Sequence, residues 1–204
     1  MLKVSEVTKK WNDQTILHCL SFSVKQGERV ALTAPSGTGK TTLISILAGI
    51  DKEFSGTVAL KCKKRGVVFQ EPGLFWYKTV GQNILYPLEL EKLPLDRQIQ
   101  ERYRLWLCVT GLGKYEDHYP HEISRGMKQK TALVRALILN PDFLLMDEPF
   151  SAMDKASVTS IVNHIHSSCP GITLVAASHT LEGSLDFFDK VLVAEKTPIT
   201  KFEI

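Results

Sequence analysis

One stretch of the sequence decides the fold: Ala34-Pro35-Ser36-Gly37-Thr38-Gly39-Lys40-Thr41-Thr42. It follows an apolar run predicted to be a strand, Val30-Ala31-Leu32, and it precedes a predicted helix over residues 43–49 that Gly49 closes. The glycines of such a strand-to-helix turn let successive backbone N–H groups point into one concavity, and the helix N-terminus adds partial positive charge. The stretch therefore predicts a cradle for a polyphosphate.

Two residues of this stretch narrow the choice of ligand. Lys40 would reach the β- and γ-phosphates of a nucleotide, and the Thr41 hydroxyl would hold Mg²⁺. The pattern is the P-loop G-x-x-x-x-G-K-[ST] with Ala34 in place of the leading glycine, a change that causes strain only if its φ is positive. An ordinary Gly/Ser loop is the alternative, which Gly-Lys-Thr at a strand-to-helix junction disfavours. We expect residues 34–42 to bind a nucleoside triphosphate.

Composition places the chain among soluble globular proteins. Its 204 residues suffice for one domain with a sizeable core, and 44% are hydrophobic and 23% charged. A net charge of +3 gives no argument for nucleic acid, and we expect no such partner. The run Lys61-Cys62-Lys63-Lys64-Arg65 could be a basic contact patch, but without interleaved aromatic residues it favours a solvated strand or turn.

The cysteines and the chain termini exclude several other classes. Cys19, Cys62, Cys108 and Cys169 form no C-x-x-C pair, which predicts four reduced, mostly buried thiols in a cytosolic protein. The N-terminus alternates like a strand and lacks the apolar core of a signal peptide. No stretch approaches the roughly 20 apolar residues that span a bilayer. Any action on a membrane is therefore expected to need a partner.

The order of predicted elements indicates an α/β protein. Residues 1–32 alternate like strands, and further strands are predicted at 54–60, 66–69, 143–146, 172–176 and 191–193. Between them, a capping box at Thr79 opens a helix that ends before Pro87, and another helix covers 126–139. A second helix runs from Asp96 to Gly111 with one buried face, made of Ile99, Tyr103, Trp106, Leu107 and Thr110.

These elements predict one domain, residues 1–204. Its α/β P-loop NTPase core comprises residues 1–72, which are β-rich, and residues 126–204. An inserted α-helical subdomain is expected over about residues 73–125.

A pair of carboxylates ends a predicted strand. Leu144-Leu145-Met146 leads directly into Asp147 and Glu148, at the edge where open α/β sheets bind their ligands. Side chains alternate along a strand, so one carboxylate can hold a metal while the other faces an attacking water. Asp-Glu pairs are common on protein surfaces, but an apolar run before the pair and a P-loop upstream favour the catalytic interpretation.

Further motifs resemble the ATP-binding subunits of ABC transporters, over essentially the whole chain and in the order of that family. The matching residues are Trp11 for the aromatic residue that stacks on adenine, Gln70 for the Q-loop, Ile123-Ser124-Arg125-Gly126-Met127 for the signature, Asp147 and Glu148 for Walker B and the catalytic glutamate, Ser151-Ala152-Met153-Asp154 for the D-loop, and His179 for the switch histidine. Taken singly, Trp11, Gln70 and His179 could be ordinary core, loop and strand-end residues.

The resemblance implies an ABC ATPase fold and a role for each matching residue. Catalysis would use Lys40, Gln70, Glu148 and His179; the metal Mg²⁺ would be held by Thr41, Gln70 and Asp147; and ATP would contact Trp11, residues 34–42, Ser124 and Gly126. Ser124 is also predicted to cap the helix that follows it.

The resemblance also implies partners and a place in the cell. Two copies would sandwich two ATP molecules head to tail and drive separate transmembrane permease subunits from the cytoplasmic face of the membrane. Asp-Glu-Pro-Phe at 147–150 and Met127 resemble the nitrate/sulfonate/taurine-type importers, which implies an extracytoplasmic substrate-binding protein. The chain ends soon after His179, so we expect no C-terminal regulatory domain. The sequence does not name the cargo.

Two departures from the family pattern keep alternatives open. Arg125 stands where the signature has its first glycine, and its cation could attract the opposite nucleotide, clash with it or point outward. Together with Ala34 it leaves open a regulatory nucleotide-binding protein without turnover. A soluble ABC protein that acts on DNA or the ribosome is the other alternative, although such proteins usually carry tandem cassettes or long coiled-coil insertions.

An apolar cluster follows Gln70 directly. The segment 71–79 crowds five apolar or aromatic residues into a short loop: Pro72, Leu74, Phe75, Trp76 and Tyr77. So many cannot easily be buried in one loop, and exposed aromatic residues commonly mark interfaces. We expect this loop and the helical insertion to form the permease-docking surface.

Overall fold

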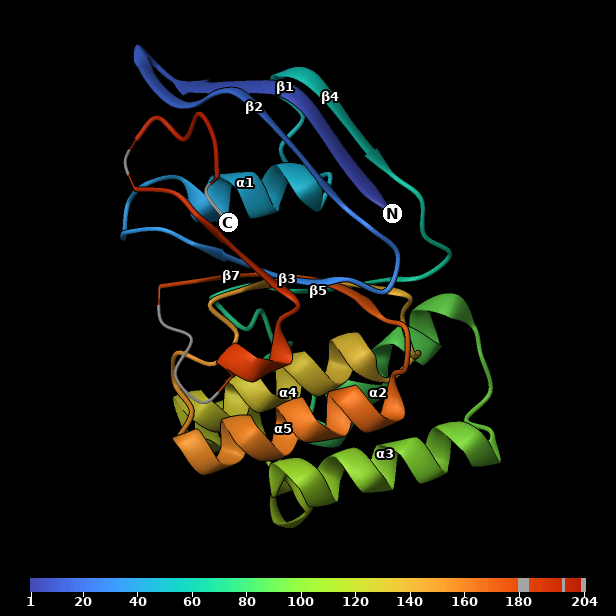
Figure 1. Ribbon diagram of the computed structural model, residues 1–204. Helices are drawn as coiled ribbons and strands as arrows, with labels where there is room; N and C mark the ends of the chain where they lie inside the picture. The colour runs from blue at the N-terminus through green and yellow to red at the C-terminus, as the bar shows by residue number, and fades with distance from the viewer. Residues whose placement is uncertain (180–183, 196, 203–204) are drawn as a thin grey trace.

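The protein is built in layers around two β-sheets (Figure 1). The computed structural model describes residues 1–179, 184–195 and 197–202. A three-stranded sheet lies on one side, a five-stranded sheet lies in the middle, and helix α1 (Lys40–Leu47) lies between them (Figure 1). Four further helices cover the opposite side of the five-stranded sheet: α2 (Val80–Glu91), α3 (Arg97–Thr110), α4 (Arg125–Leu137) and α5 (Lys155–Ser168).

The smaller sheet is antiparallel and comes from the N-terminal part of the chain. It has the order β2-β1-β4, formed by Leu2–Trp11 (β1), Gln14–Val24 (β2) and Ser55–Leu60 (β4). Apolar and polar residues alternate in this part of the sequence because successive side chains of a strand point to opposite faces of the sheet. Leu2 and Val4 face α1 and are buried, while Lys3 between them is exposed. The predicted β-rich N-terminal part is confirmed.

The larger sheet is parallel and brings distant parts of the chain together. Its order is β5-β6-β7-β3-β8, formed by Arg65–Val68 (β5), Phe143–Asp147 (β6), Thr173–Ser178 (β7), Arg29–Thr33 (β3) and Lys190–Val193 (β8). Every residue of β6 and β7 is buried, as their continuous apolar runs predicted. Because the strands are parallel, the residues after β3, β5, β6 and β7 meet at one edge.

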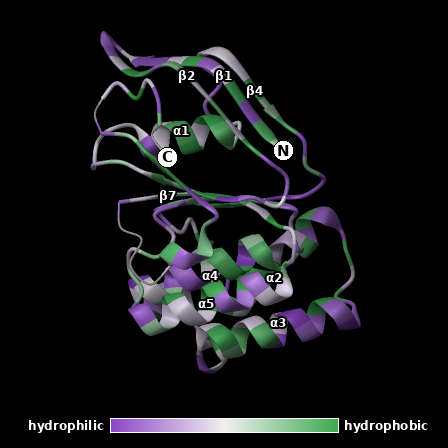
Figure 2. Ribbon diagram, viewed as in Figure 1, coloured by the Kyte–Doolittle hydropathy of each residue, from purple (hydrophilic) through white to green (hydrophobic). Residues whose placement is uncertain are grey.

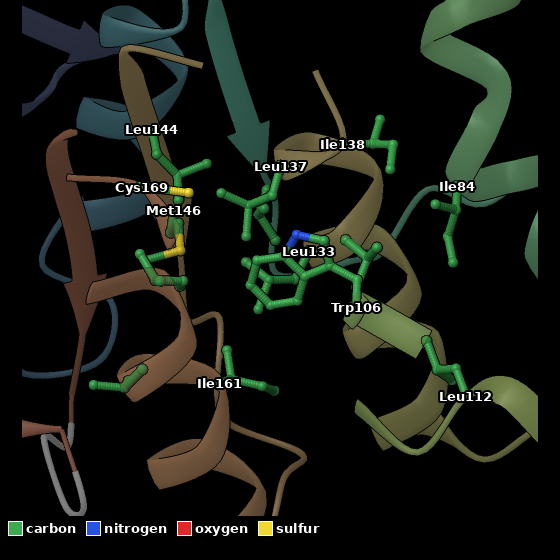
Figure 3. Close-up of a cluster of buried hydrophobic side chains, with 14 of the residues drawn as sticks. Ile84, Trp106, Leu112, Leu133, Leu137, Ile138, Leu144, Met146, Ile161 and Cys169 are labelled. Carbon is green, nitrogen blue, oxygen red and sulfur yellow. The ribbon is translucent and has the colours of Figure 1, made fainter. Parts of the chain in front are cut away.

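The helical layer is built on amphipathic faces. Asp96 and Gly111 cap α3, and its buried residues are the five predicted from the spacing: Ile99, Tyr103, Trp106, Leu107 and Thr110. Trp106 packs in one apolar core with Leu133 and Leu137 of α4 and Ile161 of α5 (Figure 3). Green apolar segments lie along the strands and on α1 between the sheets (Figure 2). Among the described residues, no helix is long and apolar enough to cross a bilayer.

The prediction that the first helix of this layer ends before Pro87 is wrong. Helix α2 continues through Pro87 to Glu91, after the predicted capping box of Thr79 and Gln82. Proline lacks the N–H that would bond to the carbonyl of Asn83. The helix persists because Ile84 and Leu88, on either side of the proline, are buried in the core.

The prediction of mostly buried thiols is also wrong, although all four cysteines are free. Only Cys169 is buried, whereas Cys62 is half-buried and Cys19 and Cys108 are exposed. Cys108 lies in α3 on the face opposite the core, a position that composition cannot specify.

The inserted region has the expected content. Residues 73–125, all of which the structure describes, contain α2, α3 and short 3-10 helices at Gly113–Tyr115 and Pro120–Glu122, and no strand. Helix α4, which follows, packs on both α2 and β5. The division into a core and a helical subdomain remains a prediction.

Candidate active site

The P-loop has the geometry of an anion cradle. Gly37 and Gly39 have φ values of 78° and 106°, in the left-handed region that favours glycine, whereas Ala34 has no positive φ and is unstrained. A Cβ on Gly39 would also clash with the Cγ2 methyl of Ile16, so a larger residue here would have to displace that side chain. The Lys40 ammonium curls back over the loop and donates to the carbonyl of Ala34 at 2.6 Å.

Nine of the predicted site residues line one cleft of about 350 Å³. They arrive from different elements: the P-loop between β3 and α1, and the segments that follow β5, β6 and β7. The lining residues are Ile16, Ser36, Gly37, Gly39, Lys40, Thr41, Thr42, Gln70, Glu148 and His179. Residues more than a hundred positions apart in the chain therefore share one polar cavity.

The Glu148 side chain has three side-chain contacts in this cleft. It is 6% exposed, and its backbone is held in the left-handed region at φ 46°. One carboxylate oxygen accepts a hydrogen bond from the Ser178 hydroxyl at 3.1 Å and lies 2.8 Å from Nδ1 of His179. The other oxygen lies 4.0 Å from the Lys40 ammonium. These contacts fix the carboxylate at the point where the ends of β6 and β7 face the P-loop.

Asp147 has the opposite environment. Its side chain is 1% exposed, and within the part of the chain that the structure describes neither carboxylate oxygen has a hydrogen-bond partner. Burial raises the pKa of Asp147, the nearby Glu148 charge adds to this rise, and the Thr41 hydroxyl and the Lys40 ammonium oppose it. A buried carboxylate that burial keeps short of partners, beside a threonine hydroxyl, is a donor set that fits a divalent cation.

The described residues form no metal site built from protein side chains alone. They contain no group of three or more His, Cys, Asp or Glu side chains that could hold a metal ion. A cation in this cleft would therefore take most of its oxygen ligands from phosphates and water, as Mg²⁺ does.

Trp11 lies outside the cleft lining. It ends β1, its side chain is 54% exposed, and the Lys9 ammonium lies 4.4 Å from the centre of its ring. Lys9 itself is buried, paired with Asp51 at 2.9 Å and bonded to the carbonyl of Glu53. Contact of Trp11 with a base thus stays a prediction.

Two residues of the site were missed from the sequence. Ile16 lines the cleft from β2, and Ser178 donates to Glu148. Ser178 stands directly before His179, so its closeness to the site could have been inferred. Nothing in the local sequence marks Ile16, because its position depends on how the N-terminal sheet lies on the P-loop.

The signature segment lies apart from this cleft. Ser124 caps α4, its hydroxyl accepting from the Met127 N–H at 3.3 Å, as predicted. A Cβ on Gly126 would lie 2.5 Å from the carbonyl oxygen of Ala152, so glycine is required for the D-loop backbone to approach. The Arg125 side chain is 64% exposed, and its guanidinium lies 3.7 Å from Glu71.

The D-loop aspartate has a structural contact of its own. Asp154 is the N-cap of α5, and its carboxylate accepts hydrogen bonds from both the N–H and the hydroxyl of Ser157. These hydrogen bonds lower the pKa of Asp154.

The fold and the cleft define a P-loop ATPase, and comparison with known proteins identifies the family. The ABC transporter family matches residues 17–151. The chain belongs to this family and is an ATP-binding, ATP-hydrolysing subunit of an ABC transporter.

Individual relatives cover nearly the whole chain. It is 31% identical to the aliphatic sulfonates import ATP-binding protein SsuB of Bacillus anthracis, over 97% of this chain and 82% of that protein. It is 32% identical to the sulfate/thiosulfate import ATP-binding protein CysA of Vibrio cholerae, over 99% of this chain and 58% of that protein.

Solved structures show the same fold. The dimeric structure of MJ0796, a bacterial ABC transporter cassette, superposes with a TM-score of 0.84 at 26% identity, covering 100% of this chain and 98% of that one. A dimeric post-hydrolysis state of MJ0796 bound to ADP and Pi gives 0.81 at 25% identity, with both chains covered completely.

Proposed function

We propose that this ATPase subunit powers import through separate permease subunits, which it joins at the cytoplasmic face of the membrane. The observation that carries this proposal is the convergence of Lys40, Asp147, Glu148 and His179 at one edge of the parallel sheet. The names of the relatives, which are import ATP-binding proteins, support the direction of transport. The dimeric structures of MJ0796 support a head-to-tail pair of this chain with two ATP molecules.

The metal in this proposal is Mg²⁺. Thr41, Gln70 and Asp147 would hold it together with phosphate oxygens. The observation that fits this ion is the buried carboxylate of Asp147, whose oxygens accept no hydrogen bond from the residues that the structure describes. When bound, the ion would neutralise the charge that develops on the phosphates.

The chain's own residues would position the reacting groups. The Lys40 ammonium would turn from the carbonyls of its own loop to the β- and γ-phosphates. The Glu148 carboxylate, held by Ser178 and His179, would orient or deprotonate the attacking water. If Nδ1 of His179 donates to Glu148, then Nε2 can donate to the γ-phosphate only when the ring is doubly protonated.

The substitution Glu148→Gln tests these roles. ATP binding should persist, but hydrolysis should fall at least about 100-fold, or about 2.7 kcal/mol in the barrier, because the water-positioning carboxylate is lost. An ATP-dependent dimer should accumulate in size-exclusion chromatography. Glu101→Gln, in an exposed ion pair of α3, is the matched control and should leave turnover unchanged. Native turnover in the Glu148 variant would show that another group is catalytic.

The same experiment separates the second candidate function. A regulatory nucleotide-binding protein without turnover is suggested by Arg125 at a signature glycine position. Such a protein would bind ATP but show no hydrolysis that Glu148→Gln could remove. A purified subunit that turns over ATP would reject it.

The docking surface for the permease is proposed to be the loop 71–79 with the helical insertion. None of its five apolar residues is buried, and Trp76 and Tyr77 are 77% and 55% exposed. Trp76→Glu should uncouple transport while leaving ATP binding intact, as measured in proteoliposomes. Leu185→Glu, at an exposed leucine of the 3-10 helix Leu185–Phe187, is the control. A Trp76→Glu variant that fails to fold would assign this cluster to the core.

The cargo class follows from the relatives only as a proposal. We infer an importer of the nitrate/sulfonate/taurine type, with an extracytoplasmic binding protein that selects the substrate. Co-purification with a membrane permease, followed by uptake assays with aliphatic sulfonates, sulfate and nitrate, would test it. Co-purification with ribosomes or DNA would instead support a soluble ABC protein.

A further inference from the structure

Helix α4 holds the loop after β5 on the near side of Gln70. The side chain of Gln129, in the middle of α4, is 2% exposed and donates to the carbonyl of Phe69 at 3.3 Å. A buried amide with a backbone partner is lost only at a cost, because the carbonyl would then be left without its donor. The residue before Gln70 is therefore tied to the helix whose N-terminus carries the signature.

The same helix holds the loop on the far side of Gln70. The guanidinium of Arg135 donates to the carbonyl of Pro72 at 2.8 Å and to that of Gly73 at 3.0 Å, and it lies 6.0 Å from the centre of the Phe75 ring. A planar guanidinium suits two neighbouring acceptors, and bonds from a charged donor are about twice as strong as neutral ones. Arg135 is half-buried, and this burial lowers the pKa of its guanidinium.

A second anchor fixes the other end of this segment. Asn83 of α2 is fully buried, accepts from the N–H of Phe75 at 2.8 Å, and donates to the carbonyls of Phe75, Lys78 and Thr79. Residues 72–78 thus form a strap between α4 and α2. The exposed side chains of Trp76 and Tyr77 stand between these two anchors.

A further ion pair between α4 and the loop is weaker. Arg125 and Glu71 approach to 3.7 Å, but their side chains are 64% and 87% exposed. Exposed ion pairs of this kind contribute little, so Arg125 does not define the position of the strap.

We propose that Arg135 is a positioning residue that makes α4 and the strap move as one body. When the N-terminal end of α4 or Gln70 moves, Trp76 and Tyr77 would then move with it. The strap stays attached because separating it from α4 would leave two carbonyls and a half-buried cation without their hydrogen bonds. This inference rests on the proposed docking role of the strap, but it concerns the connection and not the dock itself.

Hydrogen exchange of the free subunit tests the connection without the permease. Addition of Mg²⁺ and a non-hydrolysable ATP analogue should change the exchange of residues 72–78 in the wild-type chain. Arg135→Gln should remove at least about four-fifths of that change while nucleotide affinity stays within about threefold. Arg102→Gln is the matched control, since Arg102 also donates to a backbone carbonyl, that of Ile138, away from the strap.

Coupled activity supplies the second measurement. Permease-stimulated ATP hydrolysis should fall at least about fivefold in Arg135→Gln and remain normal in Arg102→Gln. Arg135→Lys keeps the charge but lacks the planar guanidinium, so it should reduce the exchange response at least about twofold. This variant serves as the test if Arg135→Gln does not fold.

Several results would overturn the proposal. One is an exchange response in Arg135→Gln or Arg135→Lys that equals the wild-type response. Another is a loss of this response in Arg102→Gln as large as in Arg135→Gln. The third is a wild-type strap whose hydrogen exchange does not change when nucleotide is added. A wild-type response without permease stimulation would instead reject the docking role and leave the connection standing.

Discussion

Replacement of Asp147 by asparagine should stabilise the protein when no metal is present. The carboxylate is 1% exposed, both of its oxygens lack partners among the described residues, and the charge of Glu148 lies beside it. A neutral amide of nearly the same shape removes the buried charge and its repulsion. The native carboxylate is thus expected to favour cation binding at the expense of stability.

The size of the effect follows from this burial. An unsatisfied buried polar group costs about 1–3 kcal/mol, more when it is charged, and part of that cost remains with the amide. We expect Asp147→Asn to add about 1–3 kcal/mol to the free energy of unfolding. For a domain of this size, 1 kcal/mol corresponds to about 2–4 °C, so Tm should rise by about 2–12 °C.

The sign of the pH dependence is fixed by the same cause. Because the folded pKa of Asp147 is raised above 3.8, the folded state binds more protons than the unfolded state between the two values. The metal-free wild type should therefore lose stability as the pH rises through this window, and the asparagine variant should not. The stability gap between them should be largest above the raised pKa.

Thermal unfolding with EDTA, with ATP alone and with Mg²⁺ and ATP is the assay. The wild type should gain about 2.7 kcal/mol from Mg²⁺ with ATP at a hundred times Kd, and the variant should lose the magnesium-dependent part. Asp142→Asn is the control at the other end of β6. There the N–H groups of Lys63 and Lys64 lower the pKa of an exposed carboxylate, so this substitution should destabilise.

The Asp142 control has the opposite pH dependence. Its contribution to stability is present above pH 3.8 and is lost as the pH falls through the lowered folded pKa. If Asp147→Asn lowers the metal-free Tm as Asp142→Asn does, the carboxylate of Asp147 is already compensated, and the reasoning that links its burial to a cation is wrong.

Three further substitutions test other parts of the molecule. Trp11→Ala should weaken ATP binding by about 1–3 kcal/mol if the indole stacks on adenine, as measured by calorimetry, and unchanged affinity would make Trp11 structural. Arg125→Gly should change turnover by less than about tenfold, or 1.4 kcal/mol, because its side chain points outward; a larger change in steady-state ATPase assays would contradict this. Gly126→Ala should destabilise by about 1–3 kcal/mol in chemical denaturation, since its Cβ would lie 2.5 Å from the carbonyl of Ala152, whereas Gly113→Ala, with open space around it, should not.

Much of the fold could be predicted because the relevant signals are local. The buried face of α3 follows from a 3.6-residue period, and its ends follow from Asp96 and Gly111. The buried strands β6 and β7 follow from continuous apolar runs. The end assigned at Pro87 failed because a local rule about proline was outweighed by the burial of Ile84 and Leu88 on either side.

The candidate site divides in the same way. The P-loop and the Asp147-Glu148 pair are continuous in the chain, so their residue types and order already predicted a nucleotide and a metal. Ile16 and the contact of Ser178 with Glu148 were missed, because they depend on how separate strands lie against the P-loop. The exposed position of Arg125 likewise depends on how α4 lies beside the loop of Glu71.

The sequence alone determined the class of protein, since backbone turns, helix caps and motif order are set by neighbours within a few positions. Tertiary structure alone decided that Asp147 is buried with no hydrogen-bond partner among the described residues, while Glu148, the next residue, is held by Ser178 and His179. It also decided that Arg135 bonds to a loop more than sixty positions away. The physical reason is that burial and hydrogen-bond partners are properties of surfaces brought together by packing, and no local pattern encodes which surfaces will meet.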